Sequence, residues 1–158
     1  MRTPPHQTSF NFSGLLQLTN NEMAEDMISH LLTILGKDFH VRSLDMSANN
    51  IGYDDSIDPR VTVALGENLG KLTELQELYL NGNAIGAADG VTTEGTQALA
   101  RGIGSLSTLE YLDLSVNPLG SGTESNVTDG LAALGSALPS LRRLRTLNMA
   151  KWRNMLCD

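Results

Sequence analysis

The side chains that most often carry chemistry in proteins are few and scattered in this sequence of 158 residues. His6, His30 and His40 lie in three separate segments, and none of their spacings is that of a metal-binding pair. Cys157 is the only cysteine, which excludes a disulfide framework and a cysteine-based zinc site within one chain. We therefore expect no enzymatic activity, no metal site and no cofactor.

Carboxylates gather in three short segments, and paired carboxylates serve in acid–base catalysis or bind calcium when several oxygens converge. Exposed loops are poor sites for acid–base work, and the D-x-D-x-D-G spacing of a calcium loop is absent. The segments are either acidic binding loops or solvated helix starts, where acidic residues interact favourably with the helix dipole. They cover residues 53–60, 87–94 and 121–129, with Asp54, Asp55, Asp58, Asp89, Glu94, Glu124 and Asp129.

The elements that position these residues repeat along the chain. Three units of 34 or 35 residues begin alike: 41–74 with VRSLDMSANNIG, 75–108 with LQELYLNGNAIG and 109–143 with LEYLDLSVNPLG. Apolar residues at alternate positions, such as Leu44 and Met46, predict a short strand at the start of each unit. Leu65, Leu69 and Leu72 have the four-then-three spacing of one helix face, which recurs in the later units. Each unit is therefore expected to be strand, loop and helix.

The shared pattern, L-x-x-L-x-L-x-x-N-x-[IL]-G before a helix with L-x-x-x-[LI]-x-x-L, resembles a leucine-rich repeat of the long, ribonuclease-inhibitor-like subtype. The resemblance covers residues 41–149. It implies an α/β fold: a right-handed βα solenoid, forming a segment of a horseshoe, with a parallel sheet on the concave side and helices on the convex side. Physical reasoning agrees, because one strand and one helix bury their apolar faces only by stacking on neighbouring units.

An asparagine recurs in each complete unit, as Asn49, Asn83 and Asn117. Backbone groups lose their ladder partners where the chain leaves a strand, and a buried amide supplies both a donor and acceptors. We expect these residues to form a structural ladder that ends at Trp152 in the incomplete last unit. Catalysis is disfavoured because an amide neither titrates nor attacks.

The predicted organisation has three parts: residues 1–40 as a tail and helical cap or degenerate repeat, 41–143 as three repeats, and 144–158 as a partial repeat. In the first part, Phe10 and Phe12 would occupy strand positions, and Gly36 would end a helix. The strand edge at the C-terminal end could pair with a second copy of the chain, because an open edge is a template for pairing. The last residues folding back, or a longer array, are the alternatives.

Alternation along the strands predicts which side chains point outward on the concave face. Tyrosines there supply a large contact area with a polar tip, and aspartates select a Lys or Arg partner. This face is the candidate binding site. Its residues are Asp45, Glu77, Tyr79, Asn81, Tyr111, Asp113, Ser115 and Asn148.

Charge is divided along the chain, whose formal net value is −7. Residues 44–130 hold 13 acidic and three basic residues, whereas residues 142–153 hold five basic residues and no acidic one. An acidic middle repels nucleic acid and anionic membranes and favours a basic protein surface. No apolar run approaches the ~20 residues that cross a bilayer, and no signal peptide is evident, so we expect a cytoplasmic protein.

The expected function is therefore a non-enzymatic interaction module that binds a basic partner protein through its concave face and acidic loop edge. One alternative is a GTPase-activating protein for nuclear-transport GTPases, which this subtype of repeat resembles and which holds its partner in a reactive conformation. Arg60 and Arg101 are the arginines considered as sources of a finger. A bacterial effector or a fragment of a larger receptor would act by the first mechanism.

Overall fold

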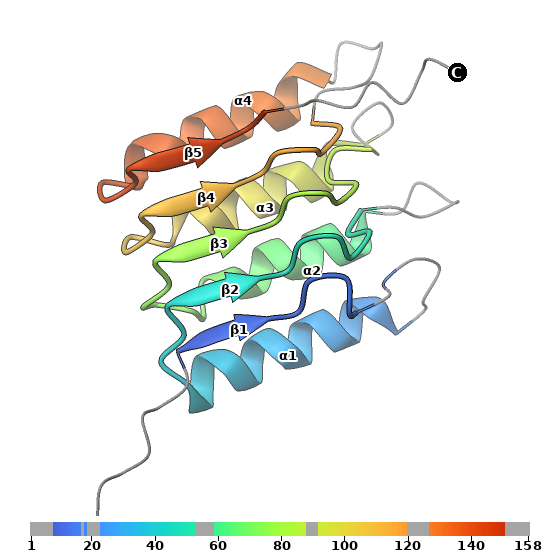
Figure 1. Ribbon diagram of the computed structural model, residues 1–158. Coiled ribbons are helices and arrows are strands. Elements are labelled where there is room, and N and C mark those ends of the chain that lie inside the picture. Colours follow the sequence, from blue (N-terminus) through green and yellow to red (C-terminus); the bar gives the residue numbers. More distant parts are fainter. Residues whose placement is uncertain are drawn as a thin grey trace, which may run out of the picture.

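Strands and helices alternate along the chain in the computed structural model, which describes residues 8–16, 18, 23–52, 59–87, 92–119 and 127–150. The strands form one sheet, and the helices lie together behind it (Figure 1). In chain order the elements are β1 (Ser9–Asn11), α1 (Ala24–Asp38), β2 (Ser43–Asp45), α2 (Arg60–Leu69), β3 (Glu77–Tyr79), α3 (Glu94–Gly104), β4 (Tyr111–Asp113), α4 (Val127–Ala137), the 3₁₀ helix η1 (Leu138–Ser140) and β5 (Thr146–Asn148).

The sheet has the strand order β1-β2-β3-β4-β5, and every neighbouring pair is parallel. Pairing follows the sequence repeat, because Phe10 lies beside Leu44, Leu44 beside Leu78, and Leu112 beside Leu147. A parallel pair needs a crossover connection, which a helix supplies in each unit. The α/β fold predicted from the repeat, a βα solenoid with a parallel sheet, is confirmed.

The core lies between the sheet and the helices and consists mainly of leucine. Leu78 of β3 is fully buried, as are Leu65 and Leu69 of α2, and Ile103 of α3 is 1% exposed. The four-then-three spacing therefore marked buried residues correctly, but its third member in each of these units, Leu72 or Leu106, lies in the turn after the helix and not on the helix face. Gly52 is held in the left-handed region, at φ 89°, where a side chain would also lie 2.7 Å from the Ala84 carbonyl oxygen of the next unit.

Helices α2 and α3 approach each other through glycines. A Cβ atom on Gly66 would lie 2.3 Å from the carbonyl carbon of Ala98, and one on Gly102 would lie 2.1 Å from the carbonyl oxygen of Gly66. Such distances are far inside van der Waals contact, so the two backbones meet directly. The sequence analysis assigned these glycines no role, because it considered only the helix face that points at the sheet.

The first unit has its own aromatic packing. The Phe10 ring meets the Phe39 ring edge-to-face, with centroids 5.1 Å apart, and stacks beside Phe12 at 6.4 Å. The expectation that Gly36 ends the helix is wrong, since α1 continues to Asp38. A Cβ atom on Gly36 would lie 2.7 Å from the Lys71 carbonyl oxygen, so this glycine permits close contact with the next unit. The division of the chain at residues 41 and 144 stays a prediction.

Candidate functional site

The open face of the sheet, turned away from the helices, presents side chains in rows that cross the strands. The first row precedes the second by two residues in every strand, and a third row follows the strand ends. The first row is Ser9, Ser43, Glu77, Tyr111 and Thr146, the second is Asn11, Asp45, Tyr79, Asp113 and Asn148, and the third is Ser13, Ser47, Asn81, Ser115 and Ala150.

Four of the five second-row side chains hydrogen-bond to their own backbone. Each accepts from the N–H two residues later, at 2.9 Å for Asn11, Asp45 and Asp113 and at 3.1 Å for Asn148. Asp and Asn form such turns readily because their short side chains reach that N–H. The second row therefore closes the turn at the end of each strand, and Tyr79 is its one exception.

Asp113 and Ser115 were predicted to be available to a partner, and the structure places them differently. Each is 8% exposed. The Ser115 hydroxyl donates to Oδ1 of Asp113 at 2.6 Å, and the Asn148 amide donates to Oδ2 at 3.0 Å. Tyr111 also donates to Oδ2, at 3.4 Å. These neighbours cover Asp113 and occupy both of its oxygens, so it acts within the fold.

Asp45 has the same first bonds and a different environment. Ser47 donates to its Oδ1 from both the backbone N–H, at 2.9 Å, and the hydroxyl, at 2.6 Å. Within the described ranges, no group donates to Oδ2 of Asp45, because Ser43 and Tyr79 stand where Tyr111 and Asn148 stand around Asp113. Asp45 is half-buried and keeps one oxygen available to an incoming donor.

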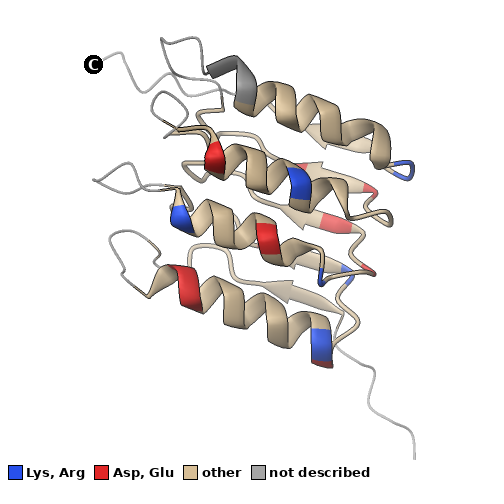
Figure 2. Ribbon diagram, turned by 180° about the vertical axis from the view of Figure 1, so that it is seen from behind, with Lys and Arg blue, Asp and Glu red and all other residues tan. Residues whose placement is uncertain are grey.

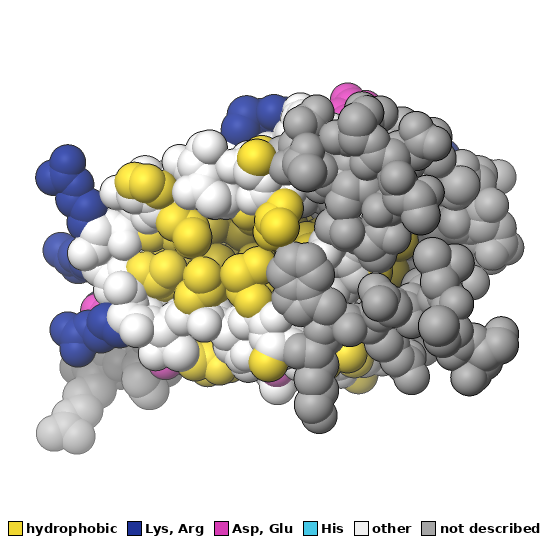
Figure 3. Space-filling view, turned by 90° about the horizontal axis from the view of Figure 1, so that it is seen from above, with side chains coloured by type: hydrophobic (Ala, Val, Ile, Leu, Met, Phe, Trp, Pro, Cys, Tyr) yellow, Lys and Arg dark blue, Asp and Glu magenta, His cyan; other side chains and the backbone are white. Residues whose placement is uncertain are grey.

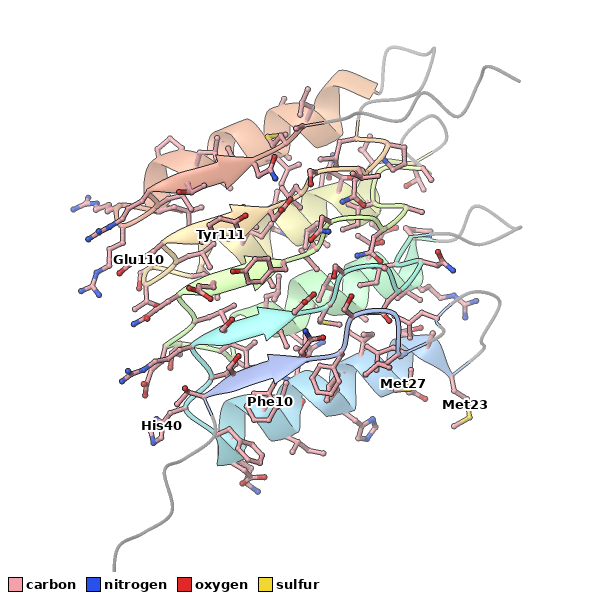
Figure 4. All side chains as sticks on the ribbon, viewed as in Figure 1. Phe10, Met23, Met27, His40, Glu110 and Tyr111 are labelled. Carbon is pink, nitrogen blue, oxygen red and sulfur yellow. The ribbon has the colours of Figure 1, made fainter. Side chains whose placement is uncertain are left out.

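Tyr79 and Tyr111 form a pair at the middle of this face. Their ring centroids are 5.0 Å apart and the rings are tilted by 36°; Figure 4 shows Tyr111 on the side of the sheet opposite the helices. Tyr79 donates to Oε2 of the exposed Glu77 at 3.4 Å. Burial raises the pKa of Tyr79, assisted by the charge of Glu77, and burial with the charge of Asp113 raises the pKa of Tyr111. Both hydroxyls therefore remain neutral donors at physiological pH.

The recurring asparagines bind the backbone of two units at once. The Asn83 amide nitrogen donates to the carbonyls of Met46 and Leu80, at 3.0 and 2.9 Å. Its oxygen accepts from the N–H groups of Asn49 and Ile51, at 2.9 and 3.1 Å. Asn49 and Asn117 make equivalent bonds to their own and the preceding unit. These side chains therefore satisfy backbone groups where the strands end.

The acidic loop edge lies largely outside the described residues, which exclude Asp54, Asp55, Asp58, Asp89 and Glu124. Glu94 is exposed at the start of α3, and the side chain of Asp129 lies outside the described part of the chain. On the helix side, charged residues lie on α1, α2 and α3 (Figure 2). The loop edge accordingly stays a prediction.

Other chemistry-bearing groups form no cluster suited to metal binding in the parts of the chain that the structure describes. There, no three His, Cys, Asp or Glu side chains are placed to hold a metal ion. His40 and Glu74 meet at 2.5 Å, and their side chains are 67% and 44% exposed. Among the described helices, none has the length and apolar character to cross a bilayer.

The fold, a parallel sheet with a helix after each of its first four strands, is consistent with a leucine-rich-repeat solenoid. A family model described as "Leucine Rich repeat" matches residues 37–55, which include the end of α1, all of β2 and Asn49. The match supports a leucine-rich repeat in this chain. No curated protein matches the sequence.

Sequence reasoning brought the right strands together and misjudged part of the open face. Glu77, Tyr79 and Tyr111 lie at its centre, with Asn81 half-buried in the next row. The role of Asp113 was missed, although its signal was visible. Asn or Asp followed two residues later by serine occurs at 11–13, 45–47 and 113–115, where each strand ends. That recurrence indicates a turn rather than a ligand contact.

Proposed function

We propose that this protein is an interaction module that binds a basic partner protein through the open face of its sheet. The match to a leucine-rich repeat supports an interaction module in general. Tyr79 is the observation that favours this face. At the position equivalent to Tyr79, the other four strands have a side chain that closes the local turn, whereas β3 has a half-buried aromatic ring beside a second tyrosine.

The charges around this pair favour a cationic partner. Glu77 is exposed, and Asp45 keeps an unoccupied oxygen among its described neighbours. The outward positions of the five strands hold no Lys or Arg. An Arg or Lys side chain laid on Tyr79 would gain a cation–π contact and a carboxylate within reach. A rigid tyrosine loses little conformational freedom on binding, which suits it to be an anchor.

The acidic loops would extend this surface, and a cytoplasmic location belongs to the same proposal. Mechanistically, the module holds its partner and performs no chemistry on it. The alternative of GTPase activation has no specific observation in its favour.

A paired-variant capture experiment tests the proposal. The triple variant Glu77→Ala, Tyr79→Ala, Tyr111→Ala removes the centre of the face and spares Asp113, which the fold uses. The control, Glu67→Ala with Arg101→Ala, removes charges that are exposed on the helix side. Each protein is used as bait, and captured proteins are quantified by mass spectrometry. We expect the wild type and the control to capture the same basic proteins. The triple variant should capture about tenfold less of each of them.

Two checks make the result decisive. Circular dichroism and thermal unfolding must show that the triple variant is folded, because an unfolded bait would lose capture whichever surface binds the partner. Purified candidate partners are then titrated at two salt concentrations, since binding by exposed charges weakens as salt rises. Equal capture by the triple variant and wild type would show that binding uses another surface.

A further inference from the structure

The C-terminal end of the solenoid presents an apolar surface that no described residue covers. We call it the end face, and it consists of Gly135, Leu138, Leu144 and Leu147. Seen along the stack, apolar side chains gather there in one patch, with Lys and Arg side chains at one border (Figure 3). Leu147 is 36% exposed, whereas Leu112, its equivalent one unit earlier, is 1% exposed. Among the residues that the structure describes, the end face is therefore a core surface left open.

The geometry of α4 shows what kind of element would fit. Gly66 of α2 occupies the position that touches the next helix, where a Cβ atom would collide with Ala98 at 2.3 Å. Gly135 is the equivalent residue of α4, and a Cβ atom there would meet nothing within 4 Å. Gly135 thus retains the small surface against which a neighbouring helix packs, with open space in front of it.

The layers point to the same missing element. Each of β1 to β4 is followed by a helix that covers the inner side of the sheet, and after β5 the structure describes only residues 149 and 150. Leu144, just before β5, is only partly buried. A single helix laid beside α4 would cover both the inner side of β5 and Gly135.

The charge pattern of α4 separates it from the other helices. Charged residues lie on α1, α2 and α3 (Figure 2), whereas the sequence of α4 holds one charged residue, Asp129 near its start, and none over residues 130–137. Ala132 and Gly135 are exposed there. A helix whose outer side is always exposed to water normally carries charged residues on that side. This observation is independent of the exposed leucines and also indicates a covered surface.

Basic residues at the border of the end face indicate the direction in which a bound helix would run. Arg142, Arg143 and Arg145 are exposed in the turn before β5, and Arg145 forms an ion pair with the partly exposed Glu110, at 3.5 Å. The four helices run in the same direction and end at the side where such turns lie (Figure 1). A helix parallel to them would bring its negative C-terminal end to these arginines, and acidic residues in its last turn would add to the attraction.

We propose that the end face binds an amphipathic α-helix of a partner protein. The helix lies parallel to α4, packs its apolar face on Leu144, Leu147 and Gly135, and sets an acidic C-terminal turn against Arg142 and Arg145. This site is separate from the open face of the sheet and selects the opposite charge. The partner therefore differs from the basic one proposed above.

A synthetic helix drawn from this chain is the probe. Residues 92–106 span α3, which fills the equivalent place inside the solenoid. A staple joining positions 97 and 101, four residues apart, holds the peptide helical on the side away from its leucines. One version ends in two added glutamates and its matched control in two lysines. Titration into the full chain, followed by amide NMR shifts, should give saturable changes at residues 144–149, with the acidic version about threefold tighter at low salt.

The variant Gly135→Leu tests the position. Since no atom lies within 4 Å of the new Cβ and leucine favours helix over glycine, the fold is retained while the place of the partner helix is filled. Thermal unfolding of the variant alone verifies this. We expect Gly135→Leu to lose peptide binding. Glu67→Leu, a matched change at an exposed position of α2, should keep it.

Four results would overturn the proposal. They are no saturable shifts with the wild-type chain, equal binding to Gly135→Leu, self-association of the wild-type chain that Gly135→Leu removes, and peptide binding that begins only when residues 151–158 are deleted. The third result would assign the end face to a second copy, and the fourth to the chain's own last residues. The capture experiment with the open-face variant is unaffected by any of them.

Discussion

The interior of the stack and its C-terminal end use the same residue positions with opposite outcomes. Gly66 lets two helix backbones meet, whereas its equivalent Gly135 faces open space. Leu112 is buried between neighbouring units, whereas Leu147 is 36% exposed. The comparison teaches that burial in this fold belongs to a position's neighbours and not to the position itself. A repeat is stable only to the extent that another unit covers it.

The largest expected effect comes from one substitution made in two places. Gly66→Ala puts a methyl group 2.3 Å from the Ala98 backbone, so α2 and α3 must separate along their contact. We expect a loss of about 3 kcal/mol in the free energy of unfolding, at the upper end of overpacking effects. Gly135→Ala should instead gain about 0.5–1 kcal/mol, because alanine favours helix. Urea unfolding measures both, and similar values for the two variants would contradict the comparison.

Truncating a leucine column gives the next effect. Leu112→Ala removes a side chain that is 1% exposed and leaves a cavity between units, which should cost about 3 kcal/mol. Leu147→Ala removes one that is already 36% exposed and should cost about 1 kcal/mol. Denaturant midpoints at constant slope provide the measurement. Should Leu147→Ala cost as much as Leu112→Ala, the end face is covered in solution.

The asparagines extend the contrast to hydrogen bonds. Asn83→Ala removes four bonds and leaves the buried N–H groups of Asn49 and Ile51 without an acceptor, which we expect to cost about 2 kcal/mol. Asn11→Ala, in the first strand, removes one exposed bond to Ser13, so its cost should stay below about 1 kcal/mol. Hydrogen exchange of the Ile51 amide should quicken only in Asn83→Ala.

The smallest effect concerns pH. Burial and neighbouring carboxylates raise the pKa of Tyr79 and Tyr111 above 10.0 in the folded chain. The folded state therefore holds these protons more tightly than the unfolded state. The stability that this difference supplies is full below pH 10 and declines as the pH rises through the folded pKa. Unfolding measured between pH 9 and 11 should show the decline, and the double variant Tyr79→Phe, Tyr111→Phe should flatten it.

Much of the fold followed from the repeat, because strands that recur every 34 residues with the same apolar pattern pair in one register. The open face followed only in part. Alternation placed Tyr79 and Tyr111 correctly on one side of the sheet. Alternation does not show that Asn148, on the neighbouring strand, donates a hydrogen bond to Asp113. Asp113 was therefore predicted to be available to a partner, whereas the structure encloses it.

The sequence by itself determined the unit: a strand, an asparagine that satisfies the turn and a helix with one leucine face. These are local features, set by side-chain spacing and backbone hydrogen bonding. Only the tertiary structure decided which copies of each position are buried, that Gly36 and Gly66 serve contact between units, and that Gly135 faces open space. The reason is that burial depends on distances between units, and those distances are not written in the pattern of any one of them.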